Sequence, residues 1–276
     1  MTSTTDNGSQ PLLRITTEAG VETWHLANAP VNALSPELLE ELETAITRVT
    51  ELDDIAVVVI SSDLRVFSAG ADATWMAETV AEIGSAALVD AFNVSMDRFR
   101  AVCLSLRKLP ALVIAAIDGH ALAGGLELAA ACDLRFCSDS EKVQLGVPEM
   151  DLFGAMPSGG GGVQYLTRLM GPSRALEFVL EAKPITPERA YAVGLIERLA
   201  PAGDVLTAAQ AFAAQVATKA GRIGVSAAKR SMLGGAELPL EQALDLDHGI
   251  HWHSMRNGNF VPGVEAFVAR FGSSTR

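Results

Sequence analysis

Short apolar runs rich in β-branched residues alternate along this chain with longer stretches in which apolar residues recur every three or four positions. The short runs predict strands that are buried on both faces. They lie at residues 56–60, 112–117 and 134–137, and residues 12–27 predict a further pair of strands. The longer stretches predict helices at residues 36–49, 83–107, 127–132 and 163–170. This order of strand, helix and strand favours an α/β fold with parallel strands.

Two helix starts are marked by residues that cap helices. Ser35 precedes Pro36, and Thr186 precedes Pro187. A Ser or Thr side chain accepts a hydrogen bond from the first helical turn, and proline fits the first helical position because no N–H is needed there. Helices are therefore expected to begin at residues 36 and 187.

Composition divides the chain into three parts. Residues 1–11 are polar, with neither the basic start nor the apolar stretch of a secretory signal, and are expected to form a flexible tail. Residues 12–203 carry the alternating pattern and predict the α/β core. Residues 204–276 follow a Pro-Ala-Gly-Asp break and are almost wholly helical in pattern. The apolar faces of these helices need a partner to bury them, so this region is expected to mediate oligomerisation.

Charge and hydropathy exclude several classes of protein. The chain has 276 residues, with 21 Lys and Arg against 33 Asp and Glu, and a formal charge of −12. An acidic surface repels a phosphate backbone, so no nucleic-acid partner is expected. Hydrophobic residues make up 49% of the chain, too many for a disordered protein. The longest apolar run, residues 111–117, is far shorter than the roughly 20 residues that cross a bilayer, so no membrane partner is expected.

The three cysteines, Cys103, Cys132 and Cys137, form no metal-type CxxC pair and are predicted to be reduced thiols of a cytoplasmic protein. A nucleophilic Cys132 is the alternative. Its small apolar neighbours and the lack of a histidine close in the sequence argue against it.

A cluster near the carboxyl end, His248, His251 and His253 with Asp245 and Asp247, is the one candidate for metal binding. Asp247 and His251 lie four residues apart and would share one face of a helix. A polar helix face or a subunit contact is the favoured interpretation because no HExxH pattern occurs. No metal is therefore expected.

Two carboxylates have settings that suggest chemistry. Glu127 is the only charged residue between Asp118 and Asp133, and burying a carboxylate among small apolar residues is costly. Glu149 follows a strand-like segment and a Gly-Val-Pro turn. Two carboxylates in one partly dry pocket can take different protonation states and serve as base and acid. A favourable charge at a helix start is the alternative for Glu127, and a surface position after a turn is the alternative for Glu149.

Small residues at two turns could present backbone N–H groups to a ligand. Gly124 and Gly125 lie at a predicted strand-to-helix turn, and Ala69, Gly70 and Ala71 follow a predicted strand. Amides at a helix start suit a developing oxyanion, and two such amides from separate turns would stabilise a thioester enolate. Close packing is the alternative role for such glycines.

Other common signatures are missing from the sequence. The four glycines at residues 159–162 are not followed by Lys-Ser/Thr, so a Walker-type nucleotide site is disfavoured. No GxGxxG fingerprint follows the first strand. No GxSxG elbow occurs and Ser68 has no evident histidine partner, which disfavours a serine hydrolase.

Several motifs together resemble the crotonase (enoyl-CoA hydratase/isomerase) superfamily. They are FSAGAD at residues 67–72, GHALAGGLELAAACD at 119–133, VPEM at 147–150 and the glycine-rich segment at 157–166. The resemblance extends from about residue 12 to residue 271. It implies a ββα spiral core with a carboxyl-terminal helical region that builds trimers or pairs of trimers. It also implies an acyl-CoA thioester as substrate, with no separate cofactor.

The resemblance implies roles for particular residues. Ala71 and Gly124 match the positions whose N–H groups form the oxyanion hole of this family. Glu127 and Glu149 match the two acidic residues that hold the water and exchange protons, with Glu149 as the donor to Cα.

Contacts to the substrate are expected from residues around these motifs, namely Ala69, Gly70, Asp72, Trp75 and Gly125. The family often has a Lys and an acidic residue where this chain has Thr74 and Trp75. Trp75 is therefore predicted to line the acyl or pantetheine channel, with packing of a helix as the alternative.

The leading hypothesis is an enoyl-CoA hydratase that adds water syn across the double bond of a 2-enoyl-CoA. An enoyl-CoA isomerase, which needs one carboxylate, and another crotonase-type lyase or hydrolase are the alternatives among enzymes, because one scaffold hosts many chemistries. A non-catalytic protein that binds CoA thioesters is the alternative of another class.

Overall fold

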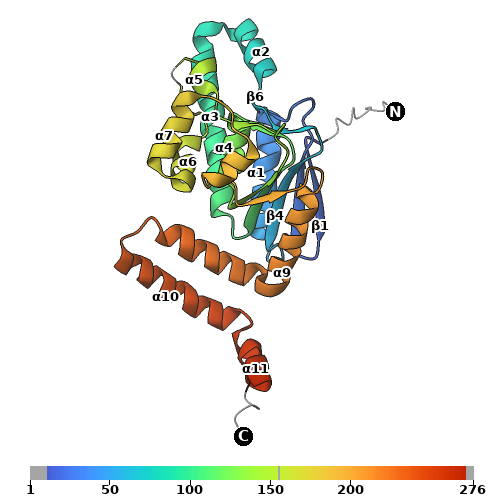
Figure 1. Ribbon diagram of the computed structural model, residues 1–276, viewed down its shortest axis with the longest axis vertical. Helices are drawn as coiled ribbons and strands as arrows, with labels where there is room; N and C mark the ends of the chain where they lie inside the picture. The colour runs from blue at the N-terminus through green and yellow to red at the C-terminus, as the bar shows by residue number, and fades with distance from the viewer. Residues whose placement is uncertain (1–10, 155, 272–276) are drawn as a thin grey trace, which may run out of the picture.

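The computed structural model describes residues 11–154 and 156–271 (Figure 1). The predicted amino-terminal tail lies outside the described residues except for Pro11, which is exposed. The strands are β1 (Leu13–Glu18), β2 (Val21–Leu26), β3 (Ala33–Leu34), β4 (Val57–Ser62), β5 (Val66–Ser68), β6 (Gly70–Ala71), β7 (Leu112–Ile117), β8 (His120–Leu122), β9 (Leu134–Ser138), β10 (Leu145–Gly146) and β11 (Arg198–Ala200). The helices of the core are α1 (Pro36–Glu51), α2 (Ala73–Ile83), α3 (Ser85–Lys108), α4 (Gly124–Ala131), α5 (Glu149–Leu152), α6 (Gly162–Met170), α7 (Pro172–Glu181) and α8 (Pro187–Ala192).

Successive turns of the chain add one strand to each of two sheets. The larger sheet has the order β1-β2-β4-β7-β9-β11, and the smaller one has the order β10-β8-β5. The pairs β4/β5, β7/β8 and β9/β10 each contribute one strand to both, and all pairings except β1 with β2 are parallel within these sheets. A third, two-stranded sheet pairs β3 with β6. This is the predicted ββα spiral.

The sequence pattern located the main elements correctly. β7 has the predicted bounds, the predicted pair at residues 12–27 forms β1 and β2, and Ser35 and Thr186 accept capping hydrogen bonds from Leu38 and Arg189. The caps work as expected because each side-chain oxygen reaches an N–H of the first helical turn.

Two segments differ from the prediction. Residues 66–68 and 70–71, for which the sequence pattern predicts no strand, form the short strands β5 and β6. The helix expected from residue 83 is preceded by α2, which begins at residue 73, and α3 itself starts at Ser85. No residue of α2 is buried, although Met76, Val80 and Ile83 recur at helical spacing in its sequence.

The larger sheet is covered on both faces. One face packs against α1, α3 and α4 around a core that includes Trp24, Phe67 and Phe99. The other face packs against the first half of α9 (Val205–Lys229), which buries Val205, Ala209 and Ala213. Burial on both faces explains why the central strands are continuous apolar runs.

The carboxyl-terminal helices extend away from this core (Figure 1). α9 bends at Gly221, where φ is 57°, and continues into the π-helical turn η1 (Arg230–Gly234). α10 (Leu240–Asn257) folds back along α9, and α11 (Phe260–Phe271) follows it. The predicted division at residue 204 stays a prediction. The first half of α9 packs on the sheet, and the helix bends at Gly221.

A buried ion pair joins α9 to the core. The Lys229 Nζ atom lies 2.7 Å from the Asp133 carboxylate and donates to the carbonyls of Leu106 and Ala111, each at 3.0 Å. Burial raises the pKa of Asp133 and lowers the pKa of Lys229. The pair is therefore costly to desolvate, and it fixes the direction of α9 more than it adds stability.

Candidate active site

A small cavity lies beside the amino end of α4. Its volume is about 20 Å³, enough for one water molecule. It is lined by Leu34, Ala71, Phe92, Met96, Phe99, Ala123, Gly124, Glu127, Glu149, Phe153, Met156 and Gly159. Of these described residues, only the two glutamates are ionisable, so any proton transfer in the cavity falls to them.

Two backbone segments bring amide groups to this cavity. Ala71 lies on β6, and Gly124 is the first residue of α4. They come together at Gly70, where a Cβ atom would lie 2.8 Å from the Gly124 nitrogen, so the approach requires glycine. The first N–H groups of a helix have no partner within it and carry partial positive charge. This placement suits the binding of an oxygen atom with negative charge.

The backbone turns abruptly into α4 at Ala123, whose φ is 51°. Residues other than glycine rarely adopt a positive φ, and such strain persists only where the surrounding structure enforces it. Here the Ala123 carbonyl accepts the N–H groups of Leu126 and Glu127, which leaves the amino end of α4 directed at the cavity.

The Glu127 carboxylate is held by four hydrogen-bond donors. Its Oε2 atom accepts from the Ser158 hydroxyl at 2.7 Å and from the N–H groups of Gly160 and Gly162 at 2.8 and 2.7 Å. Its Oε1 atom accepts only a longer bond of 3.3 Å, from the N–H of Gly159. The side chain is 2% exposed, so these donors replace the water that a charged carboxylate requires. Oε1 is the oxygen left with capacity for a further partner.

The glycine run before α6 is explained by this carboxylate. A Cβ atom at Gly162 would lie 2.4 Å from the Glu127 Cγ atom. Cβ atoms at Gly159 and Gly160 would lie 2.3 Å from the Met96 sulfur and 2.2 Å from the Phe99 ring. Only a chain without side chains can bring its N–H groups this close to a buried carboxylate.

Glu149 lies in the same cavity but in a different environment. It is the first residue of α5, is 3% exposed, and its Oε2 atom has no hydrogen-bond partner among the described residues. Burial, and to a smaller extent the charge of Glu127 and a hydrogen bond to it, raise the pKa of Glu149 to about 7. Glu149 can therefore carry a proton at neutral pH while Glu127 accepts hydrogen bonds.

The structure brings together four of the predicted site residues, Ala71, Gly124, Glu127 and Glu149. The predicted substrate contacts Ala69, Gly70, Asp72, Trp75 and Gly125 are not among the residues that line the cavity, and their contact with substrate stays a prediction. Three have evident structural roles. Asp72 caps α2 by accepting the N–H groups of Thr74 and Trp75, and a Cβ atom at Gly125 would lie 2.3 Å from the Ser68 carbonyl oxygen. Gly70 permits the close approach described above.

Sequence reasoning missed the apolar wall of the cavity and the Ser158 hydroxyl. Phe92, Met96 and Phe99 lie on one face of α3, at spacings of four and three residues. That spacing is visible in the sequence, but it is equally typical of ordinary core packing. The bond from Ser158 to Glu127 spans 31 residues and leaves no local signal.

The alternatives weighed for Cys132 and for the histidines find little support. Cys132 is buried, and burial raises the pKa of its thiol to about 12, so it stays protonated at neutral pH. In the described part of the chain, no group of three or more His, Cys, Asp or Glu side chains is arranged to hold a metal ion. Asp247 instead accepts a hydrogen bond from Ser231. None of the described helices combines the length and apolar character needed to cross a membrane.

Known proteins resemble this chain in fold and in sequence. A probable mitochondrial enoyl-CoA hydratase of Dictyostelium discoideum is 32% identical over 240 residues, which cover 87% of this chain and 81% of that protein. A probable enoyl-CoA hydratase of Mycobacterium bovis is 31% identical over 243 residues, 87% of this chain and 88% of that protein. The crystal structure of an enoyl-CoA hydratase from Bacillus anthracis superposes with a TM-score of 0.85 at 29% identity, covering 94% of this chain and 96% of that one.

The spiral of paired sheets and these structural likenesses define a protein of the crotonase class. The chain belongs to the enoyl-CoA hydratase/isomerase family, whose sequence profile matches residues 16–272.

The glycine requirement around Glu127 predicts the effect of one methyl group. Gly162→Ala forces the new Cβ atom into the Glu127 side chain, so we expect it to lower the free energy of unfolding by about 1–3 kcal/mol. Urea unfolding measures this. Gly249→Ala on α10 is the matched control, because nothing lies within 4 Å of its added Cβ atom and alanine favours a helix. Equal stability of the two variants would contradict the proposed crowding.

The environment of Glu149 predicts a pH dependence of stability. Its pKa of about 7 lies above the ordinary 4.5, so between these values the folded protein holds a proton that the unfolded chain releases. Stability should therefore fall as pH rises through this range, and Glu149→Gln should remove that loss. In thermal unfolding at pH 5, 6, 7 and 8, the stability of Glu149→Gln relative to the wild type should increase as the pH rises. The control Glu188→Gln, at an exposed position, should differ from the wild type in stability by the same amount at every pH. The same constant difference for Glu149→Gln would refute the raised pKa of Glu149.

Proposed function

We propose that this chain is an enoyl-CoA hydratase that adds water syn across the double bond of a 2-enoyl-CoA thioester. One observation carries the proposal. Two buried glutamates, one supplied with four donors and one with an unpartnered oxygen, share a cavity with the backbone of Ala71 and Gly124. The names of the relatives support the same activity.

The thioester carbonyl oxygen would lie between the amides of Ala71 and Gly124. Attack at Cβ moves the π electrons of the double bond toward that oxygen, which gains negative charge as an enolate. Amides fixed at a helix start stabilise this charge without reorganising, and removal of one such donor typically costs about 10²–10³ in rate. The coenzyme A part belongs to the substrate, so the reaction needs no separate cofactor.

The two glutamates would divide the proton transfers. Oε1 of Glu127 holds the attacking water and takes one of its protons as the C–O bond forms at Cβ. Protonated Glu149 then donates to Cα, and the enolate collapses to the saturated thioester. Glu127 now carries the proton that Glu149 lacks, and transfer between the two restores the starting state. Both new bonds form on the side of the substrate that faces the glutamates, which gives syn addition.

An isomerase is the second candidate within this family. Isomerisation moves a proton between two carbons of the substrate and needs one carboxylate. The careful arrangement of both Glu127 and Glu149 in one cavity favours hydration, which uses a base and an acid. It also disfavours a non-catalytic thioester-binding protein, for which two buried carboxylates would be a cost without a benefit.

Crotonyl-CoA hydration tests the proposal. We expect Glu127→Gln and Glu149→Gln each to lower kcat by about 10²–10⁴, because each removes one proton-transfer group while keeping the side-chain shape. Loss of the absorbance of the conjugated thioester measures the rate. Glu188→Gln, an exposed carboxylate on α8, should leave the rate unchanged. A wild-type protein that binds crotonyl-CoA without turnover would overturn the hydratase assignment, as would full activity in either site variant.

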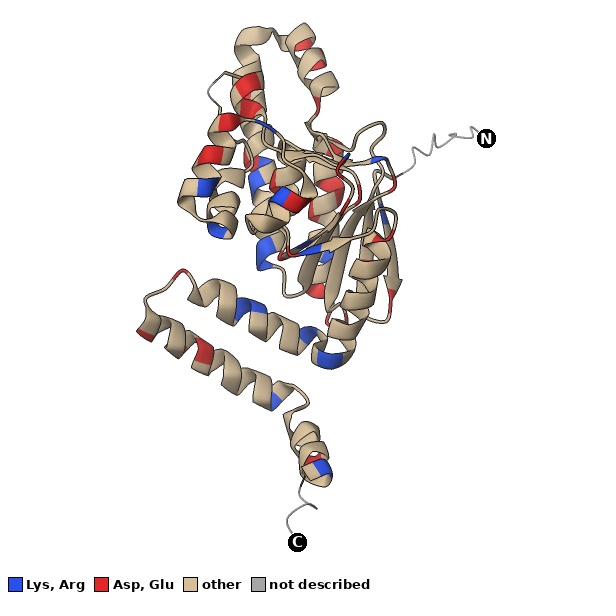
Figure 2. Ribbon diagram, in the orientation of Figure 1, with Lys and Arg blue, Asp and Glu red and all other residues tan. Residues whose placement is uncertain are grey.

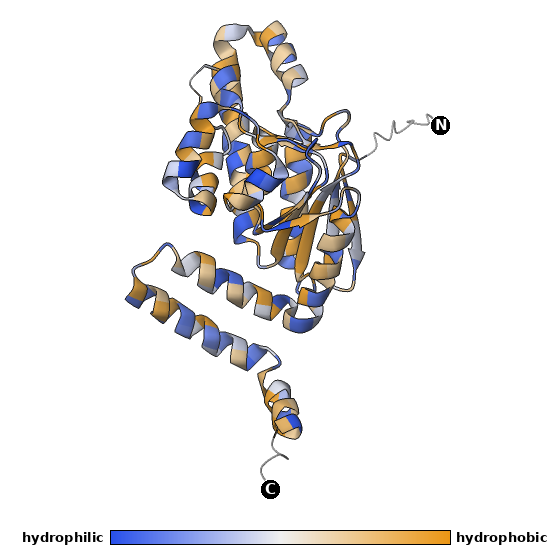
Figure 3. Cartoon of the chain, viewed as in Figure 1, coloured by the Kyte–Doolittle hydropathy of each residue, from blue (hydrophilic) through white to orange (hydrophobic). Residues whose placement is uncertain are grey.

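We also propose that the protein is a cytoplasmic homotrimer or a pair of trimers assembled through the carboxyl-terminal helices. α11 has no buried residue, although Phe260, Val264 and Phe267 lie on it. Figure 3 shows hydrophobic positions along both α10 and α11. Leu240 is 74% exposed and Phe267 is 63% exposed in the single chain. Such apolar faces on helices that extend from the core are typical of subunit contacts.

Light scattering after size-exclusion chromatography measures the assembly. We expect about 87 kDa for a trimer, three times the 29.0 kDa of the chain, or twice that for a pair of trimers. Phe267→Asp should shift the mass toward the monomer because it places a charge in the contact. Leu176→Asp, an equally exposed position on α7, should not. A monomeric wild type would refute this assembly.

A further inference from the structure

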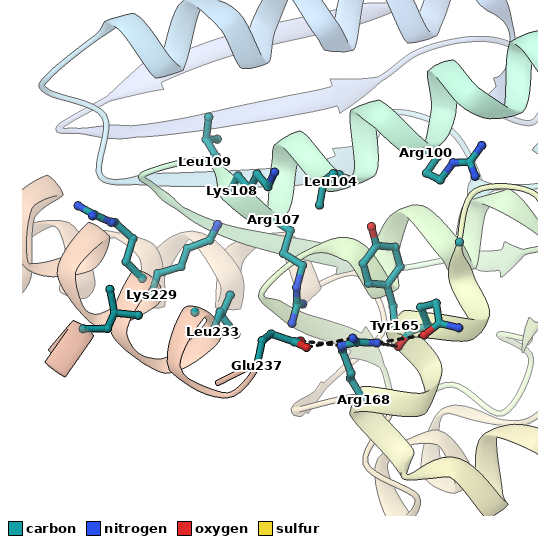
Figure 4. A pocket seen from close by; sticks show the side chains of 15 residues that line it. Arg100, Leu104, Arg107, Lys108, Leu109, Tyr165, Arg168, Lys229, Leu233 and Glu237 are labelled. Atoms are coloured by element: carbon teal, nitrogen blue, oxygen red, sulfur yellow. Dashed lines mark hydrogen bonds and ion pairs between the residues drawn. The ribbon is translucent and has the colours of Figure 1, made fainter. Parts of the chain in front are cut away.

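A second and much larger pocket lies between the core and the carboxyl-terminal helices (Figure 4). Its volume is about 740 Å³, within the usual range for sites that bind small molecules. α3 and α6 form one wall, and α9, η1 and α10 contribute the other. Gly161 and Tyr165 line this pocket, while neighbouring Gly159 lines the catalytic cavity. Both spaces therefore border the segment that holds Glu127.

The charge of this pocket is opposite to that of the chain. Six of its 15 lining residues are Lys or Arg and one is acidic, whereas the chain has 21 basic and 33 acidic residues. Figure 2 marks basic residues at the carboxyl end of α3 and on α9, which face each other across the gap. Low-dielectric walls lined by one sign of charge concentrate ions of the other sign, so the pocket attracts anions.

Several of these cations already have partners. Arg168 pairs with Glu237 at 2.8 Å. Lys229 pairs with Asp133, and Arg100 pairs with Asp97. These charges are compensated within the chain.

Arg107, Lys108 and Arg230 differ from these three cations. Among the described residues, no carboxylate lies within ion-pairing distance of any of them. Within the described chain, Arg107 is the one of the three whose guanidinium lies over an aromatic ring. The group stands over the Tyr165 ring, 5.8 Å from its centroid, and points into the pocket (Figure 4). Its side chain is half-buried. Stacking on the ring fixes the guanidinium while leaving its N–H groups available to a ligand.

The remaining wall is apolar. Leu104, Leu109, Leu233 and Leu246 line it together with the Tyr165 ring. A guanidinium fork matches the two oxygens of a carboxylate, and the leucines match a hydrocarbon chain. We propose that this pocket binds an organic anion with an apolar body, a fatty carboxylate, with Arg107 holding the carboxylate. This proposal is independent of the reaction proposed for the catalytic cavity.

Calorimetric titration of the assembled protein with decanoate tests the proposal. We expect saturable binding that Arg107→Gln weakens roughly 10- to 150-fold, the range for loss of a hydrogen bond to a charged group. Arg100→Gln is the matched control. It removes a cation from the same pocket, but one already compensated by Asp97, so it should change the affinity less than threefold. Circular dichroism and unfolding temperature confirm that both variants fold.

Two further probes separate the parts of the site. Decanol lacks the charge and inorganic phosphate lacks the apolar body, so each should bind much more weakly than decanoate. If decanol binds as tightly as decanoate, Arg107 does not hold the carboxylate. If phosphate binds as tightly as decanoate, the leucines do not hold the hydrocarbon chain.

Two outcomes overturn the proposal outright. The first is no binding of decanoate, as when a second copy of the chain covers the pocket in the assembly. The second is equal binding by the wild type and Arg107→Gln, which would place decanoate elsewhere, for example in the catalytic cavity.

Discussion

The cost of burying the charge of Glu127 governs the architecture around it. A carboxylate that is 2% exposed must receive hydrogen bonds from the protein. The hydrogen bonds to Glu127 come from a segment more than 30 residues later in the chain. That segment can approach only without side chains, which accounts for the glycines before α6. These hydrogen bonds, together with the buried side chains of Tyr165, Leu166 and Met170, hold α6 against α4 beside the cavity.

The two glutamates become different because the four donors at residues 158–162 reach only Glu127. Both are buried to a similar degree and belong to the same cavity. Glu127 has four donors, whereas an oxygen of Glu149 has none among the described residues, and burial raises its pKa to about 7. Two identical side chains thus have different surroundings, which suit the base and the acid of the proposed hydration.

The sequence predicted the elements that are long enough to show a pattern of apolar residues or a capping signal. Buried strands such as β7 and capped helices such as α1 follow from continuous apolar runs and from Ser35 with Pro36. β5 and β6 have only three and two residues, too short to show a period, and α2 buries nothing. At the site, Glu127 was singled out because an isolated carboxylate among apolar residues is conspicuous, and Glu149 because it follows a strand-like segment and a turn within a family motif. The donors of Glu127 and the wall formed by Phe92 and Met96 depend on contacts between distant segments, which a single sequence does not record.

The same helix serves two purposes on either side of a bend. The first half of α9 covers the sheet with small residues, and after Gly221 the second half leaves the sheet and faces α3. The Lys229–Asp133 pair fixes this second half to the core at a cost in desolvation. Because Lys229 lines the larger pocket, this ion pair ties one wall of the pocket to the core. A wall that is fixed before a ligand binds reduces the entropy lost on binding.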